Sequence, residues 1–563
     1  MAERWISGGF AAAVVLALVA VVGWPLAATI REATRPDEDS GSREIVATAR
    51  PGEIIRPLGL AFESTRLVLA TGAIALPMGV ALALVLFRTD AWGRRAMLGV
   101  VALAAFVPMP LHATAWLGGF GNAGRSQALG VGPVLVGWSG AAFIHAMAAL
   151  PWVVALVGVG LRAVEPDLED AARMDLTPWG VIRRVTLRRS LGAVAAASLA
   201  VAVLAGGDMT VTDLLQVRTY AEESYTQYQG GNRPGAAAVA LPPLVVLGAL
   251  ILRGTRGLLR VDPARAASAS ARARDWRLGR WRVPVGLAVA ATAGNLVALP
   301  LYSLIWRAGR VGGRAIDGLA PRWSPGGLAG TLGRAAAELY GAGLARPLRS
   351  PMLASALLSA LGATATVALA WSLAWLARTP GPWRWVVAAT VALTLAVPGP
   401  VAGMALFVAY LPWPRIYDSP LLVVLAFVLR TLPYAVLILW PAVRTLPAAY
   451  FEAAAIDGYG PWGQARRVAL PLTRGAIVAA WGVAFALSLG ELPAANLVVP
   501  PGTTLLSVRV WELLHTGVES HLAGVGLVTL AVIASAGALA LGIGAWGAGI
   551  TDLGLANPGR SKS

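Results

Sequence analysis

The stretch "EAAAIDGYGPWGQARRVALP", residues 452–471, is a short polar segment between two strongly apolar regions. A related stretch, "EDAARMDLTPWGVIRRVTL" at 169–187, aligns without gaps on 452–470, and ten of the nineteen aligned positions are identical. Both copies contain Pro-Trp-Gly followed by Arg-Arg-Val. Self-similarity of this kind indicates an internal repeat. The chain is therefore expected to consist of two similar halves.

The composition places both halves in a membrane. The chain has 563 residues, of which 57% are hydrophobic and 13% charged, whereas soluble proteins carry about 25% charged residues. Apolar runs of about 20 residues, the length that a spanning helix needs, recur along the sequence. The alternating polarity of a transmembrane β-barrel is absent. We predict an all-α polytopic membrane protein.

Twelve apolar runs are predicted to span the membrane. They lie near 8–30, 65–87, 96–118, 134–161, 190–206 and 236–252, and near 284–306, 352–376, 384–411, 421–443, 474–490 and 523–547. Residues 1–252 form the first predicted half, 253–283 a linker and 284–563 the second half. The repeated stretch falls between the fourth and fifth run of each half, in the first motif segment (163–189) and the second motif segment (446–473). Six runs per half make the repeats parallel.

The basic residues indicate which side of the membrane each loop faces. The net charge is +17, and residues 253–282 carry nine Arg against two Asp. Cytoplasmic loops are enriched in Lys and Arg, and such clusters attract anionic lipid. We therefore assign the charge to the membrane rather than to nucleic acid, and place the linker and both motif segments in the cytoplasm. The other side holds about 31–64 and 307–351, although the latter carries seven Arg.

The second motif segment is predicted to form a helix–turn–helix. Pro447 suits the first turn of a helix, and Gly458 suits its C-terminal cap because glycine adopts positive φ without strain. Pro461 can begin a second short helix, and Pro471 can open the next span. A rigid polar element with a small alanine face is predicted to be a docking surface.

The second motif segment resembles the "EAA loop" of ABC-importer permeases. The matching residues are Glu452, Ala453, Ala454, Gly458, Val468, Leu470 and Pro471. In that family the loop forms a coupling helix that seats in a groove of the ATPase subunit. The resemblance implies a type I importer permease fold in a bacterial inner membrane. It also implies two ATPase subunits on the cytoplasmic side and a substrate-binding protein outside.

The first motif segment departs from the family pattern. Glu169, Ala171 and Leu187 fit, but Asp170, Asp175 and Arg188 stand where the second copy has Ala453, Gly458 and Pro471. We expect this segment to dock as well, with a different turn and weaker or asymmetric coupling. The alternative is that the segments are only interfacial helices.

The substrate is indicated only by the layout of the chain. The fused halves and residues 487–517 look most like ferric-iron permeases, and thiamine permeases are similar. Another small solute, or an ion-gradient-driven secondary carrier with internal repeats, is the alternative. A P-loop needs a lysine, and the single lysine is Lys562. ATP hydrolysis is thus expected in another polypeptide, and we predict neither a catalytic site nor a cofactor in this chain.

Other polar residues are weaker candidates. Asp208 and Glu491 occupy corresponding places after the fifth run of each half and could line a translocation path; alternatively, they cap helices or pair with a nearby Arg. An acid-and-phenol cluster outside the membrane is expected to be a solvated face; its members are Tyr220, Glu222, Glu223, Tyr225 and Tyr228. Metal ligation around His515 and His521 is possible, but an ordinary polar loop is favoured. His145 is expected to be a packed helix residue.

Overall fold

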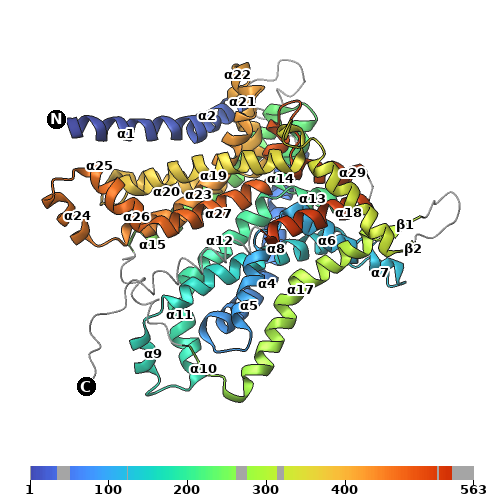
Figure 1. The fold of residues 1–563 in the computed structure, drawn as a ribbon, viewed down its shortest axis with the longest axis horizontal. Coiled ribbons are helices and arrows are strands. Elements are labelled where there is room, and N and C mark those ends of the chain that lie inside the picture. The colour runs from blue at the N-terminus through green and yellow to red at the C-terminus, as the bar shows by residue number, and fades with distance from the viewer. Residues whose placement is uncertain are drawn as a thin grey trace.

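The computed structural model describes residues 2–34, 51–122, 124–260, 275–312, 322–516 and 519–535. Nearly all of these residues are helical (Figure 1). The described strands are β1 (Arg310–Val311) and β2 (Arg322–Trp323), which pair antiparallel. The predicted all-α fold is thus confirmed.

The helices of the first half end beyond the predicted boundary at residue 252. The last of them, α15, continues to Arg260, so the first eight residues of the predicted linker are helical. The elements are α1 (Ala2–Leu18), η1 (Val19–Gly23), α2 (Trp24–Ala33), α4 (Pro51–Arg88), α5 (Arg94–Ala104), α6 (Met109–Phe120), α7 (Arg125–Ala128), α8 (Gly137–Arg162), α9 (Pro166–Ala172), α10 (Pro178–Val181), η2 (Ile182–Thr186), α11 (Leu187–Arg189), α12 (Leu191–Gly207), α13 (Thr210–Leu214), α14 (Tyr220–Gln229) and α15 (Arg233–Arg260).

The second half follows a similar order. The elements are η3 (Gly279–Trp281), α17 (Arg282–Ala308), α18 (Pro325–Tyr340), η5 (Pro347–Arg349), α19 (Pro351–Leu376), α20 (Pro382–Ala396), α21 (Gly399–Tyr410), α22 (Pro414–Tyr417), α23 (Leu421–Arg444), α24 (Ala448–Ile456), α25 (Pro461–Gln464), η6 (Ala465–Ala469), α26 (Leu470–Leu472), α27 (Arg474–Leu489), α28 (Ala495–Val498) and α29 (Leu506–Thr516). A further apolar helix, Glu519–Ser535, follows. Among the described residues, the strand pair and α18, which lie between α17 and α19, have no counterpart in the first half.

Eleven of the predicted spans correspond to seven long apolar helices and four bent helix pairs among the described residues. The twelfth, near 523–547, begins in the helix Glu519–Ser535, and its remainder lies outside the described residues. The predicted spans near 96–118 and 384–411 are not straight, because α5 meets α6 and α20 meets α21 at 106°. The spans near 190–206 and 474–490 follow bends of 62° and 73°.

Proline explains the two sharpest bends. Pro108 and Pro398 stand before α6 and α21 in extended backbone, with ψ of 146° and 151°. A second proline follows two residues later in each case, giving Val-Pro-x-Pro at 107–110 and 397–400. Proline disfavours a helical residue before it, yet is accepted in a first helical turn. We call these segments the first elbow (107–110) and the second elbow (397–400).

The two halves share backbone detail beyond the spans. The π-helices η2 and η6 cover residues that align in the repeat, since Ile182 and Ala465 are 283 positions apart. Each π-helix precedes the bend into the fifth span. Figure 1 places α24–α26 at the left and α9–α11 at the bottom, both far from β1 and β2. The repeat therefore brings both motif segments to the end of the molecule opposite the strand pair.

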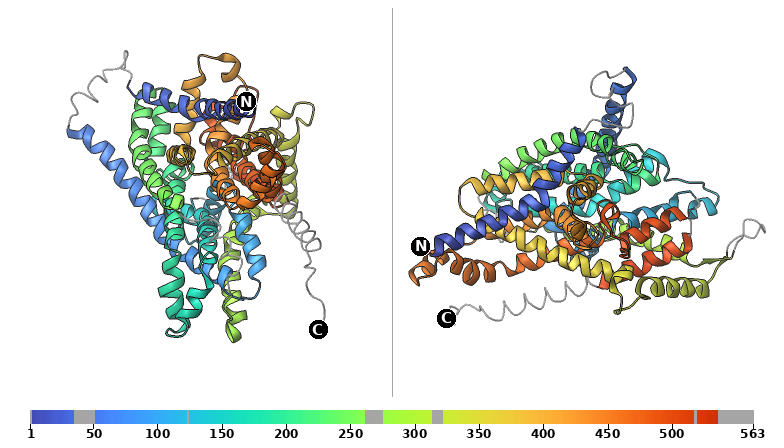
Figure 2. Two further views of the ribbon diagram at one scale, coloured as in Figure 1. Left: turned by 90° about the vertical axis from the view of Figure 1, so that its left-hand side faces the viewer. Right: turned by 90° about the horizontal axis from the view of Figure 1, so that it is seen from above.

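Each half packs some of its outer helices against the other half. The N-terminal helices α1 and α2 lie along α19 and α21 of the second half, as Figures 1 and 2 show. In return, α17 packs on α5 and α6 of the first half, and α15 packs on α20. The buried cores follow this exchange, because Val14 and Val21 belong to the core of the second half and Val289 to that of the first. Neither half completes its core alone.

A single hydrogen bond tests this exchange. The π-helix η1 disturbs the regular hydrogen-bond ladder of the N-terminal helix, and Tyr410 donates its hydroxyl to the carbonyl of Ala20 at 2.8 Å. Tyr410→Phe should lower the free energy of unfolding by about 0.5–1.5 kcal/mol. The measurement is thermal unfolding in detergent, with Tyr340→Phe, an exposed tyrosine at the end of α18, as the control. Equal melting temperatures for the two variants would contradict a role for this bond.

Candidate functional site

The helix of the second motif segment ends as its sequence predicts. Pro447 is the N-cap of α24, one position before the first turn in which it was expected. At the other end Gly458 has φ of +82°. Its amide donates to Ala455 O at 3.0 Å, and the amide of Tyr459 donates to Ala454 O at 2.9 Å. These two bonds define a Schellman motif, which requires the left-handed residue that glycine supplies.

The second short helix differs from expectation at its end. Pro461 begins α25, as predicted. Pro471, however, lies inside the three-residue helix α26, and the next span begins at Arg474 after a 73° bend. Arg467 packs on the ring of Tyr459 at 4.5 Å and donates to its hydroxyl. This contact closes the turn between the two short helices.

The second motif segment presents its polar and apolar side chains outward. Glu452, Ala453 and Ala455 are exposed, while Ala454 is buried against the protein. Ile456 is 87% exposed. Aromatic contacts anchor the segment, since Phe451 packs on Trp375 at 5.9 Å. The result is a fixed surface with a free carboxylate and an apolar tip.

In the first motif segment the corresponding glutamate faces inward. Glu169 is 1% exposed and forms an ion pair with Arg88, at the end of α4. Its other oxygen accepts from the hydroxyl of Thr186 at 2.6 Å, and Arg88 also donates to Leu161 O at 3.1 Å. Glu169 therefore fastens its segment to two spans, whereas the aligned Glu452 is open to solvent.

The turn of the first motif segment also differs. Asp175, which aligns with Gly458, is not among the residues with positive φ. Instead, the amide of Leu176 donates to Ala172 O at 2.9 Å, and the hydroxyl of Thr177 caps α10 by accepting from the amide of Gly180 at 3.3 Å. Ala171 and Arg188 are exposed, and Leu187 is half-buried. The two segments therefore share a backbone plan but present different side chains.

Asp208 ends the fifth span of the first half and is 7% exposed. Its Oδ2 accepts from the amide of Val211 at 2.8 Å, so it caps α13, and lies 3.2 Å from Nε2 of His145 on α8. His145 is fully buried, and its Nδ1 lies 2.8 Å from Ala141 O, where it must donate. A hydrogen bond between His145 and Asp208 thus requires a further proton on Nε2 or Oδ2.

Glu491 holds the matching place in the second half. Its Oε1 accepts from the amide of Ala494 at 3.0 Å, and its Oε2 lies 3.4 Å from Nε of Arg430 on α23. Arg430 also donates to Val397 O, in the second elbow, at 2.9 Å. In both halves, therefore, an acid after the fifth span caps the next turn and pairs with a base on the fourth span. The alternative expectation, that these acids cap helices or pair with a nearby Arg, describes Glu491, whereas Asp208 caps a helix and pairs with a histidine instead.

The elbows bring these acids to the interface between the halves. A Cβ placed on Gly490, next to Glu491, would lie 3.0 Å from Cβ of Pro108 in the first elbow. One placed on Gly207, next to Asp208, would lie 3.8 Å from Cα of Pro398 in the second elbow. Each elbow thus packs against the end of the other half's fifth span. Small residues there permit this close approach.

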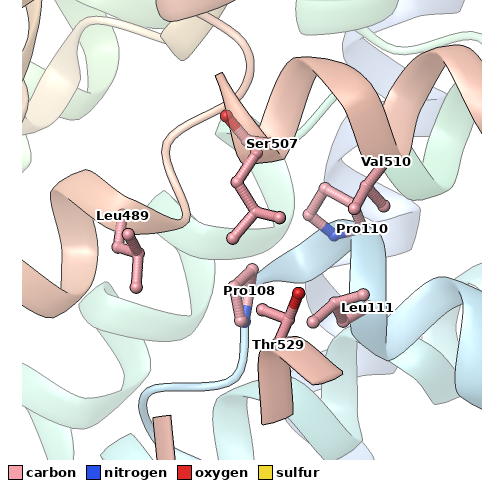
Figure 3. Close-up of a pocket in the computed structure, with 8 residues that line it drawn as sticks. Pro108, Pro110, Leu111, Leu489, Ser507, Val510 and Thr529 are labelled. Atoms are coloured by element: carbon pink, nitrogen blue, oxygen red, sulfur yellow. The ribbon is translucent and has the colours of Figure 1, made fainter. Parts of the chain in front are cut away.

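A small hollow lies beside the first elbow (Figure 3). Pro108, Pro110 and Leu111 line it from the first half, and Leu489 and Val510 line it from the second. Its cavity volume is about 10 Å³, which is room for about one water molecule and too little for a solute. The interface is therefore closed by apolar contact in this state.

The elbows were missed in the sequence although they carry a signal. Val-Pro-x-Pro occurs in the third run of both halves, at 107–110 and 397–400. Two prolines within four residues of an apolar run predict a broken span. Since the break recurs at the same place in the repeat, it could have been read as a shared feature of the interface.

The acid-and-phenol cluster is not the solvated face that was expected. Glu223 and Tyr225 on α14 are buried, and Tyr225 accepts from Asn496 of the second half at 3.1 Å. Burial raises the pKa of Glu222 above its ordinary value. The cluster therefore belongs to the contact between the halves on the side opposite the motif segments.

The histidines near residue 520 lie in helices rather than in a polar loop. His515, on α29, contacts Asp213 of the first half at 3.2 Å, and His521 pairs with Glu338 on α18. Burial would raise the pKa of Glu338, but hydrogen bonds from Arg509 and His521 outweigh it and hold the pKa below its ordinary value. Among the described residues, no group of three or more His, Asp or Glu side chains is arranged to hold a metal ion.

Comparison with known proteins agrees with the repeat. The sequence model of the family described as "Binding-protein-dependent transport system inner membrane component" matches residues 75–259 and 366–546, one match in each half. The putative 2-aminoethylphosphonate transport system permease protein PhnV of Salmonella paratyphi A is 30% identical over 142 residues, 25% of this chain and 53% of that protein. The putrescine transport system permease protein PotI of Escherichia coli is 28% identical over 153 residues, 26% of this chain and 54% of that protein. The chain thus spans about half the length of these curated relatives.

Proposed function

The chain belongs to the binding-protein-dependent transport system inner membrane components, with both permease halves in one polypeptide, and from this membership we propose how it works. It is the membrane-spanning subunit of an ATP-binding-cassette importer in a bacterial inner membrane. We propose that two separate ATPase subunits dock on the first and second motif segments. A substrate-binding protein delivers the solute to the opposite side.

The observation that carries this proposal is the geometry of the second motif segment. Gly458 closes α24 in a Schellman motif, and Arg467 closes the following turn on Tyr459. The segment therefore holds its shape while Glu452 and Ile456 project into solvent. A free carboxylate beside an apolar tip suits a groove that offers an arginine or lysine and a hydrophobic wall.

The arrangement of the halves supports transport by alternating access. ATP binding would draw the two ATPase subunits together and with them the two motif segments. Each segment leads through a π-helix and a bend into a fifth span that ends at the elbow of the other half. Movement of the segments would thus open or close the contact between the fifth spans and the elbows, where the solute crosses.

For the substrate we propose ferric iron as the first solute to test. Support comes only from the resemblance of residues 487–517 to ferric-iron permeases. PhnV and PotI are named for 2-aminoethylphosphonate and putrescine, so these compounds and thiamine are the alternatives. Vesicles that contain the assembled importer should take up the solute that its binding protein carries. Comparing the four solutes in this assay selects among them.

Docking is tested by purifying the chain from its native membrane in mild detergent. The wild-type chain should bring a P-loop ATPase with it, identified by mass spectrometry. Glu452→Ala should lower its recovery by about tenfold, since losing a charged contact costs about 1.5–3 kcal/mol. Gly458→Pro should abolish recovery, because proline can neither adopt φ of +82° nor donate to Ala455. Asp418→Ala, an exposed acid on the other side, is the control for Glu452.

The same experiment separates the importer from an ion-gradient-driven carrier. A carrier needs no ATPase, so the chain would be recovered alone, and in the vesicle uptake assay both variants would transport normally. That result would indicate that the motif segments are interfacial helices and do not dock an ATPase. Loss of the ATPase in the two variants, with the control unchanged, supports the importer.

A further inference from the structure

The end of the predicted linker is bound to the first half near the first motif segment. We call residues 275–282, which comprise a non-helical stretch at 275–278, η3 and the first residue of α17, the linker strand. Trp276 donates its amide to Arg88 O at 2.6 Å, and its own carbonyl accepts from the amide of Asp90 at 3.2 Å. Through these bonds Trp276 forms a parallel bridge with Thr89, directly after α4. The linker strand is therefore fixed by main-chain hydrogen bonds.

Side chains on both flanks strengthen this attachment. Asp275 pairs with Arg94 at 2.6 Å. The amide of Leu278 donates to Oδ1 of Asp90 at 2.8 Å, and Nε of Arg282 donates to Asp90 O at 2.9 Å. A polar clasp thus surrounds Trp276 on the cytoplasmic surface of the first half.

Trp276 also touches the first motif segment. The guanidinium of Arg173, at the end of α9, stacks over the indole ring at 4.5 Å. One helical turn earlier, Glu169 pairs with Arg88, whose backbone carbonyl holds Trp276. Arg88, Glu169, Arg173 and Trp276 thus form a closed ring of contacts. The ring joins the end of α4, the first motif segment and the linker strand.

The second motif segment has no such ring. Ile456 aligns with Arg173 and is 87% exposed, and Glu452 aligns with Glu169 and is also exposed. Its contact with the other half comes instead from the N-terminal helix, where Phe10 packs on Trp462 at 5.5 Å. Each motif segment is therefore contacted by a residue near the start of the other half's first span.

We propose that the linker strand is a positioning element for the first motif segment, in which Trp276 holds Arg173, and hence α9, in the place where an ATPase subunit docks. This inference rests on the proposed function. It explains how the first motif segment can keep a defined position although it lacks the glycine turn of the second. Because the two halves are fused, the linker contributes to coupling between the first motif segment and the ATPase subunit.

The absence of cysteine from the chain makes a direct test available. Single cysteines replace Met174 in the first motif segment or Ile456 in the second, which are 85% and 87% exposed. Each is labelled with benzophenone maleimide in native membranes and irradiated. Cross-linking to the co-purifying P-loop ATPase is then quantified at each segment, in wild-type and Trp276→Ala backgrounds.

Trp276→Ala should lower the yield at Met174→Cys by about 2- to 5-fold, as expected for loss of one cation–π contact, and leave the yield at Ile456→Cys unchanged. Trp281→Ala, an exposed tryptophan of the same strand, is the matched control and should change neither. Arg173→Ala removes the contact from the other side and should reproduce the effect. Trp276→Tyr, which keeps an aromatic face, should restore most of the yield.

The outcomes separate this inference from the proposed function. An unchanged yield at Met174→Cys in either Trp276→Ala or Arg173→Ala overturns the positioning role. Equal losses at both segments also overturn it, because they indicate general misfolding. If neither cysteine cross-links to an ATPase in the wild-type background, the proposed docking itself is wrong.

Discussion

Glu169→Ala is expected to destabilise the folded chain by about 3–5 kcal/mol, the usual cost of removing one partner from a buried ion pair. Arg88 and Glu169 are each 2% exposed at the side chain, so water cannot replace the lost carboxylate. Thr186 also loses its acceptor. The expected result is a lower melting temperature in detergent and poor recovery of the chain from membranes.

The aligned residue supplies the matched control. Glu452→Ala removes the same side chain from the same position of the repeat, but from an exposed place, so the melting temperature should stay near that of wild type. The double variant Arg88→Met with Glu169→Leu should recover most of the lost stability, because it leaves no buried charge. Equal melting temperatures for Glu169→Ala and Glu452→Ala would show that the burial of Glu169 has no energetic consequence.

Arg430→Met is expected to reduce solute uptake at least tenfold while the chain still assembles with its ATPase. Arg430 links two groups, Glu491 at 3.4 Å and Val397 O at 2.9 Å. Without it, Glu491 keeps an unpaired carboxylate at the contact between the halves, where it is 11% exposed at the side chain. Loss of these charged hydrogen bonds costs about 1.5–3 kcal/mol, which corresponds to about a tenfold or larger change in an equilibrium.

Uptake into vesicles is measured together with ATPase recovery, so that a transport defect is distinguished from failed assembly. Arg430→Lys should transport poorly too, since an ammonium group lacks the planar fork that reaches both acceptors. Arg415→Met, an exposed residue of α22, is the control. Normal uptake by Arg430→Met would show that the ion pair between Arg430 and Glu491 has no role in the transport cycle.

Local rules predicted the second motif segment well. The Gly458 turn depends on residues within five positions, and its hydrogen bonds link Ala454, Ala455, Gly458 and Tyr459. The order of the spans and the positions of eleven of them likewise follow from apolar length. The bends at the elbows were missed because the spans were predicted from hydropathy. Hydropathy detects the apolar run but not the break that its two prolines cause.

Burial of aligned residues could not be predicted from the repeat. Glu169 and Glu452 are the same residue in the same motif, yet Glu169 meets an arginine that stands 81 residues earlier in the chain. His145 and Asp208 are 63 residues apart, and Asp213 and His515 are 302 apart. Such pairs depend on how the spans pack. The sequence shows which residues could pair without showing which do.

The exchange of outer helices has a consequence for biosynthesis. Tyr410, which holds the carbonyl of Ala20, lies 390 residues later in the chain. At the ribosome's pace of about 5–20 residues per second, it emerges roughly 20–80 s after its partner. During that interval the N-terminal helix has its first-half neighbour α15 at most, and lacks α21. The face of the N-terminal helix that α19 and α21 cover in the folded chain therefore stays exposed to lipid until these second-half helices have been made.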